Sequence, residues 1–199
     1  SQLLDKESKE VKEINYSSHL DQRNIVSFIN KGSVKREEGD LQYYVTNYFN
    51  GVVLSDYVSR NGQLPEERAE KIFREILAGM KYLHCQKPVL LHNDIDPSNI
   101  MLSENNKEAI IIDMGHISER CTGLVHFDTS DLDIFYRANE TVSGIYDEQT
   151  DIFSACCVLY FMLTAHEPWQ TDIDGSSFKE RLKALWLYRK NNKLDIDAL

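Results

Sequence analysis

Three side chains suited to phosphate chemistry lie in and just after the stretch LHNDIDPSN. Asp94 and Asn99 belong to this stretch, and Asp113 follows an apolar run at 109–112, shortly before Gly115. Phosphoryl transfer from a nucleotide uses one acid to orient or deprotonate the attacking hydroxyl. An amide and a second acid hold the metal ions that bridge the phosphates. The sequence therefore predicts Asp94, Asn99 and Asp113 as catalytic residues, with Asn99 and Asp113 as the metal ligands.

The spacing of these residues resembles two motifs of the protein kinase family. His92, Asp94 and Asn99 match the catalytic loop, H-R-D-x-x-x-x-N, and Asp113 and Gly115 match the metal-binding D-F-G. Further along the chain, YRANE resembles the Y-x-A-P-E sequence that ends the activation segment. The order and spacing of several such matches carry the resemblance, rather than any one of them.

Two helices are expected to position the catalytic loop. The first starts at Pro65 and has apolar residues at a 3.6-residue period, at Ala69, Ile72, Phe73, Ile76, Leu77, Met80 and Leu83. The second is the buried apolar run at 155–163, preceded by Asp151. They resemble kinase helices E and F, which implies that Asp151 holds the loop backbone. An ordinary helix cap is the alternative for Asp151.

The first fifty residues predict a helix at 3–20 and an antiparallel pair of strands at 25–29 and 41–48, joined by a polar turn at 31–40. These resemble kinase helix C, strands four and five, and the hinge. On that match Thr46 is the gatekeeper, the backbone from Asn47 to Phe49 meets the adenine edge, and Met101 lies under the adenine. These residues are the expected nucleotide contacts.

The resemblance implies an α+β fold of the protein kinase type with two parts. Residues 1–50 would form a partial N-lobe with helix C, two strands and the hinge. Residues 51–199 would form the C-lobe, with a last helix at 178–189. Cofactors implied by this resemblance are ATP and Mg²⁺.

Several features of the family are missing or altered in this sequence. No G-x-G-x-x-G motif occurs, and no strand lysine precedes Glu13, its expected ion-pair partner. Either the molecule is a truncated kinase relative, or the chain is a fragment; an N-terminal segment or a partner chain would then complete the nucleotide site. Asn93 replaces the catalytic-loop arginine, Asp96 replaces a lysine beside the transferred phosphate, and Asp133 replaces a threonine that contacts that lysine.

Composition limits the range of partners. The chain has 199 residues and a formal net charge of −10, with 32 acidic and 22 basic residues, which argues against nucleic acid or an anionic membrane surface. No apolar run reaches the roughly 18 residues of a membrane span. Four cysteines without metal or disulfide spacing suggest a reducing compartment. We therefore expect a cytoplasmic protein that acts on, or binds, other proteins.

Three functions remain open on the sequence. The first is a serine/threonine protein kinase, favoured by the complete Asp94–Asn99–Asp113 set. The second is a pseudokinase, a binding or scaffold module without transfer, favoured by the missing glycine loop and lysine and by Asp96. The third is a small-molecule phosphotransferase of the aminoglycoside or choline kinase type. The long segment that ends in YRANE disfavours this third function.

Overall fold

The structure is a computed structural model and describes residues 12–36, 40–104, 108–120, 133–175 and 177–194. The α-helices are α1 (Lys12–Ser17), α2 (Leu54–Asn61), α3 (Glu66–His84), α4 (Glu148–Thr164) and α5 (Phe178–Asn191). The strands are β1 (Phe28–Val34), β2 (Leu41–Thr46), β3 (Gly51–Val53), β4 (Leu90–Leu91), β5 (Ile100–Ser103), β6 (Ala109–Ile111) and β7 (Ser118–Glu119). Three 3₁₀ helices complete the list: η1 (Pro97–Asn99), η2 (Ile134–Tyr136) and η3 (Asn139–Ser143).

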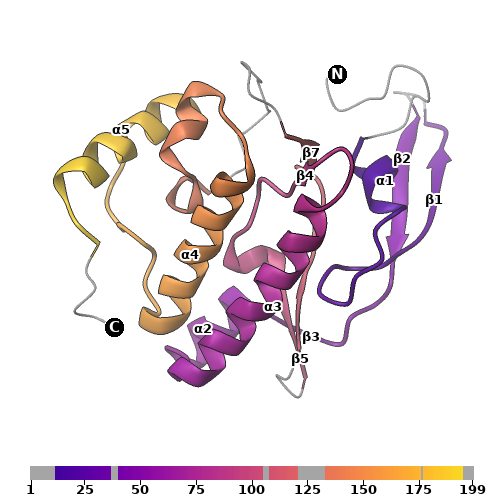
Figure 1. The fold of residues 1–199 in the computed structure, drawn as a ribbon, viewed down its shortest axis with the longest axis horizontal. Helices are drawn as coiled ribbons and strands as arrows, with labels where there is room; N and C mark the ends of the chain where they lie inside the picture. The colour runs from indigo at the N-terminus through magenta and orange to yellow at the C-terminus, as the bar shows by residue number, and fades with distance from the viewer. Residues whose placement is uncertain (1–11, 37–39, 105–107, 121–132, 176, 195–199) are drawn as a thin grey trace.

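The elements before residue 50 form a small unit at one end of the molecule (Figure 1). Strands β1 and β2 pair antiparallel, from Phe28 opposite Thr46 to Val34 opposite Leu41. The pairing confirms the predicted hairpin, but the predicted bounds of its first strand were wrong. Residues 31–34 extend the strand instead of starting the turn. Most of β1 is exposed, so its sequence lacks the alternation of a half-buried strand.

Helices α3 and α4 form the core of the larger part. Helix α3 buries one face, including Ile72, Ile76 and Met80, as its periodicity predicts. Helix α4 is apolar on all sides and is buried along most of its length. Its N-cap is Asp147, whose side chain accepts from the backbone N–H groups of Gln149 and Thr150.

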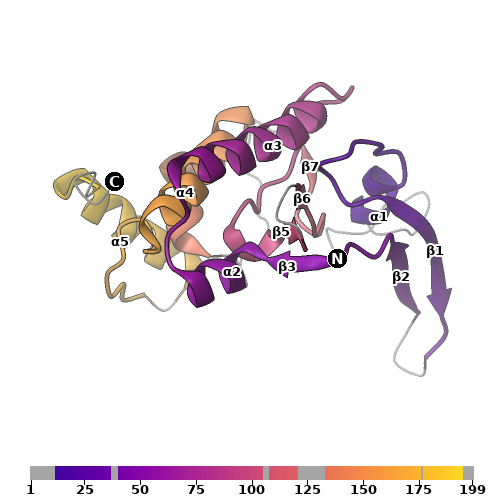
Figure 2. The same cartoon turned by 90° about the horizontal axis from the view of Figure 1, so that it is seen from below.

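A small antiparallel sheet joins the two ends of the molecule. Its strand order is β3–β5–β6, and it lies between the β1–β2 hairpin and helix α5 in both views (Figures 1 and 2). Ile25 bridges to Ile111 of β6 in parallel, which attaches the N-terminal part to this sheet. A separate pair, β4 with β7, sets Leu91 opposite Ser118. The stretch 92–99 is therefore fixed by strands at both of its ends.

Mixed helices and small sheets confirm the predicted α+β class. Of the predicted helix at 3–20, the structure describes α1 at Lys12–Ser17, and residues 1–11 lie outside the described part. Glu13 was predicted to pair with a strand lysine, and its side chain is not among those that the structure describes. The division into residues 1–50 and 51–199 stays a prediction. None of the described helices is both long and apolar enough to cross a membrane.

Candidate active site

Asp151, in the first turn of α4, fixes the start of the catalytic loop. Its carboxylate accepts from the backbone N–H of His92 at 2.9 Å and of Asn93 at 2.8 Å. His84, at the end of α3, contacts it through Nε2 at 2.9 Å. Only 1% of Asp151 is exposed. The predicted anchoring role is thus confirmed, whereas the capping role belongs to Asp147.

Asp94 and Asn99 meet directly because η1 turns the chain back on itself. The Asn99 amide nitrogen donates to the Asp94 backbone oxygen at 2.9 Å and to Asp94 Oδ2 at 2.8 Å. Since the nitrogen is used in this way, the amide oxygen of Asn99 is the atom left to act as a ligand. The structure therefore brings two of the three predicted catalytic residues into contact.

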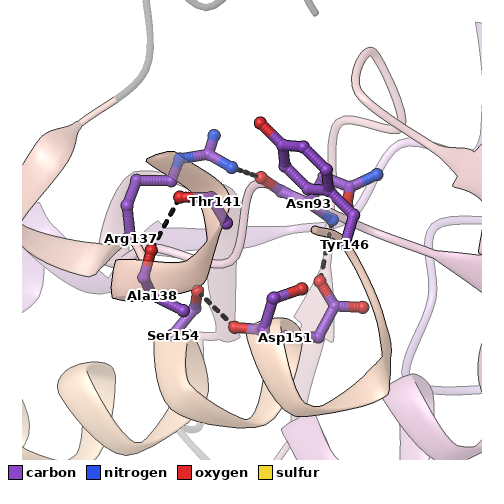
Figure 3. Close-up of a pocket in the computed structure, with 8 residues that line it drawn as sticks. Asn93, Arg137, Ala138, Thr141, Tyr146, Asp151 and Ser154 are labelled. Atoms are coloured by element: carbon purple, nitrogen blue, oxygen red, sulfur yellow. Dashed lines mark hydrogen bonds between the residues drawn. The ribbon is translucent and has the colours of Figure 1, made fainter. Parts of the chain in front are cut away.

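Sequence reasoning placed Arg137 in the YRANE motif but missed its contact with the loop that carries Asp94. Its guanidinium donates to the backbone oxygen of Asn93 and to Asp94 Oδ1, the latter at 3.0 Å. Figure 3 shows the side chain reaching from the segment after η2 toward Asn93, with Asp151 of α4 on the other side of the loop. No periodicity links Arg137 with residues so far away in sequence, so only the fold reveals the contact.

The surroundings of Asp94 disfavour its ionised form. Burial raises the pKa of this carboxyl to about 6, although the positive charge of Arg137 acts in the opposite direction. The negative charges of Asp96 and Asp113 raise it further, and the hydrogen bond from Asn99 lowers it. A carboxyl with a pKa near neutral can accept a proton during a reaction and release it afterwards.

His92 has a packing role. The residue is fully buried, and burial lowers the pKa of its ring, so the ring is neutral. Its Nδ1 accepts from the backbone N–H of Asp94 at 3.2 Å. His92 therefore shapes the loop without a charge of its own.

The two acids that replace a lysine and a threonine of the family have local structural roles. Asp96 Oδ1 accepts from the backbone N–H and the hydroxyl of Ser98, both at 2.6 Å, and so caps η1. Asp133 caps η2 in the same way, since its Oδ1 accepts from the backbone N–H of Phe135 at 2.9 Å. Each carboxylate stabilises a turn beside the loop.

Asp113 lies just after β6 in a left-handed backbone conformation, with φ at 61°. Its Oδ1 accepts from the backbone N–H of Gly115 at 2.9 Å, and the residue is exposed. Asn93 has a similar φ of 63°. Such conformations are uncommon for residues other than glycine and concentrate at functional sites. Asn93 Nδ2 also donates to His116 O and Ser118 Oγ, which ties the loop to the segment after Asp113.

The predicted adenine contacts lie at the junction of β2 and β3. Thr46 ends β2, and the N–H of Asn47 donates to Ser27 O at 2.9 Å, so that group already has a partner. The backbone of Phe49 follows shortly after. Met101, half-buried in β5, pairs with Val53 of β3. Thr46, Asn47 and Phe49 precede β3, whereas Met101 lies on β5 opposite the last residue of β3. The shared adenine site therefore stays a prediction.

The donor chemistry at the site suits magnesium bound together with a phosphate. No group of three or more His, Cys, Asp or Glu in the described parts of the chain is arranged to hold a metal on its own. One carboxylate and one amide oxygen, from Asp113 and Asn99, are the hard ligands that Mg²⁺ prefers, with phosphate oxygens and water filling its other positions. The residues therefore fit the ion only with a nucleotide present.

Fold and loop together define a domain of the protein kinase type. The profile of the family described as Protein kinase domain matches residues 2–197, and the chain belongs to the eukaryotic-type serine/threonine protein kinase family.

Curated relatives agree with the family. The chain is 30% identical over 188 residues to "Calcium-dependent protein kinase 4" of Plasmodium falciparum, a match that covers 90% of this chain and 32% of the relative. It is 31% identical over 159 residues to "Probable serine/threonine-protein kinase zyg-1" of Caenorhabditis briggsae, covering 78% and 21%. The chain thus spans about a third or less of the length of these relatives.

Proposed function

We propose that this domain transfers a phosphoryl group from magnesium-bound ATP to a serine or threonine hydroxyl of a protein. The observation that carries the proposal is the contact between Asp94 and Asn99, on a loop whose backbone Asp151 holds. This arrangement keeps a half-buried carboxylate beside the side-chain amide of Asn99 in a fixed geometry. Fixed geometry of this kind supplies much of the rate enhancement in phosphoryl transfer.

Asp94 orients the acceptor hydroxyl and takes its proton as the hydroxyl oxygen bonds to the γ-phosphorus and the bond to ADP breaks. A carboxylate has about four acceptor positions, so partners on both oxygens leave room for one more hydrogen bond. Asn99 and Asp113 would hold the magnesium, which neutralises charge on the phosphates when bound. The hinge backbone at Phe49, with Thr46, Asn47 and Met101, would contact the adenine.

The proposed acceptor is a protein, and an N-terminal segment or a partner chain would complete the nucleotide site. We propose that the protein is located in the cytoplasm. In the part of the chain that the structure describes, the cysteines Cys85, Cys156 and Cys157 are free, which supports a reducing compartment. Of these, Cys157 is buried and Cys156 is exposed.

The second candidate is a pseudokinase that binds proteins without transfer. It is favoured by Asp96, which adds a negative charge close to Asp94 where the family places a lysine. Loss of one charge-stabilising group in such a site costs about 100-fold or more in rate. Retained magnesium ligands would then serve nucleotide binding alone.

Calorimetric titration of ATP, with and without magnesium, tests the nucleotide site. We expect binding that requires magnesium and is lost in Asp113→Ala. Asp56→Ala is the matched control, because Asp56 is an exposed acid on α2 whose described partner is Arg60 of the same helix. Absence of binding by the unaltered chain, or binding indifferent to Asp113, would contradict the proposed site.

A further inference from the structure

The guanidinium of Arg137 is buried against the residue proposed to act as base. The side chain of Arg137 is 6% exposed and that of Asp94 is 14% exposed, and they form an ion pair at 3.0 Å. A second N–H of the same guanidinium donates to the backbone oxygen of Asn93. The planar fork of an arginine holds two acceptors in a defined orientation, which a flexible ammonium does less well.

The loop otherwise carries an excess of negative charge. Asp96 and Asp113 are both near enough to Asp94 for their negative charges to raise the pKa of its carboxyl. Within the described part of the chain, Arg137 is the one lysine or arginine within ion-pair distance of any of the three. The charge that the loop itself lacks therefore comes from a distant segment.

Arg189 of α5 holds that segment in place. Its guanidinium donates to the backbone oxygens of Arg137 at 2.6 Å and Phe135 at 2.7 Å. The same group lies over the rings of Trp169 and Phe153, at 4.6 Å and 5.1 Å from their centroids. Ser154 of α4 adds a hydrogen bond to the backbone oxygen of Tyr136 at 2.6 Å. The backbone on both sides of Arg137 is thus fixed by the helical part of the molecule.

We propose that Arg137 is a positioning residue for phosphoryl transfer, which holds the Asp94 carboxylate in its reactive orientation and supplies a positive charge beside it. This inference rests on the function proposed above. Arg137 touches neither the acceptor hydroxyl nor the nucleotide in this scheme. It acts through Asp94, so its loss affects the chemical step and leaves nucleotide binding in place.

The test compares Arg137→Gln and Arg137→Lys with the unaltered chain, in steady-state transfer to a serine-containing protein such as casein. For Arg137→Gln we expect kcat to fall by about 100-fold, with KM for ATP and the calorimetric affinity for magnesium-ATP unchanged. For Arg137→Lys, which keeps the charge, we expect a loss of about tenfold or less. If Arg137 had a merely structural role, its loss would lower nucleotide affinity and kcat together. The kcat of Arg137→Lys would then be no higher than that of Arg137→Gln.

The outcomes separate this inference from the proposed function. Transfer by the unaltered chain with an equal kcat for Arg137→Gln overturns the inference alone, whereas no transfer by the unaltered chain overturns both. Circular dichroism during thermal unfolding establishes whether Arg137→Gln is folded. If Arg137→Gln is unfolded, the kinetics of Arg137→Lys test the inference instead. A kcat lowered by about two- to tenfold at constant KM supports the inference. An unaltered kcat, or a kcat that falls together with the nucleotide affinity, overturns it.

Discussion

The carboxylate of Asp94 is surrounded by groups that act on it in opposite directions. Burial and two neighbouring acids favour the protonated form, while Arg137 and Asn99 favour the ionised form. The balance leaves its pKa at about 6. Sequence motifs identified Asp94, but its neighbour Arg137 and the resulting pKa depend on contacts across the fold.

The rate of transfer should fall in acid, because Asp94 must be ionised to accept a proton. With its pKa raised to about 6, we expect kcat to decrease as the pH falls through that value. In Asp96→Asn this decrease should occur at a lower pH, since the negative charge of Asp96 raises the pKa of Asp94. The variant keeps an Oδ1 that can accept from Ser98, so the turn is preserved. Measured profiles of kcat against pH that coincide for the two proteins would contradict this assignment.

Asp151 should contribute strongly to stability as well as to the geometry of the loop. The Asp151 carboxylate accepts hydrogen bonds from three donors. In Asp151→Asn the amide NH₂ group replaces one carboxylate oxygen and cannot accept any of them. We expect the free energy of unfolding in urea to fall by about 1.5–3 kcal/mol. The control is Asp147→Asn in the preceding turn, which should change stability by less than about 0.5 kcal/mol because asparagine is an equally good N-cap. Similar losses in both variants would refute the anchoring role.

At the scale of elements, the predictable parts were those with strong periodicity or a motif. Helix α3 and helix α4 have enough apolar residues in register for their burial to follow from the sequence. The bounds of strand β1 could not be predicted in this way. Its sequence, FINKGSV, contains polar residues that suggested a turn, because most of the strand is exposed. Pairing with β2, rather than its own pattern, makes it a strand.

Helix α5 was expected from its sequence, but its effect on the site was not. Arg189→Met removes the hydrogen bonds to the backbone of Phe135 and Arg137, and should therefore loosen the segment that carries Arg137. We expect faster amide hydrogen exchange across residues 133–144 and a lower kcat. Lys183→Met, an exposed change on the same helix, is the control and should leave both unchanged. Unaltered exchange in Arg189→Met would show that α4 alone holds the segment.

At the scale of the whole molecule, the site lies where three regions meet. The N-terminal part joins the sheet through Ile25, the sheet presents Met101 and leads to Asp113, and the helical part supplies Asp151, Arg137 and Arg189. The resemblance predicted Met101, Asp113 and Asp151 from their positions in the family pattern, whereas the contacts of the two arginines follow from no such pattern. The two arginines lie on later elements, and their side-chain contacts could only be seen once the chain was folded.

The central claim is transfer by Asp94, and the most direct measurement is incorporation of labelled phosphate from magnesium-ATP into serine or threonine of a protein. We predict transfer by the unaltered chain, and a loss of at least about 100-fold in Asp94→Asn, with the calorimetric affinity for magnesium-ATP retained. Phosphoamino acid analysis would identify the acceptor hydroxyl. Binding of magnesium-ATP by the unaltered chain without any transfer, or equal transfer by Asp94→Asn, would contradict the account and favour a pseudokinase.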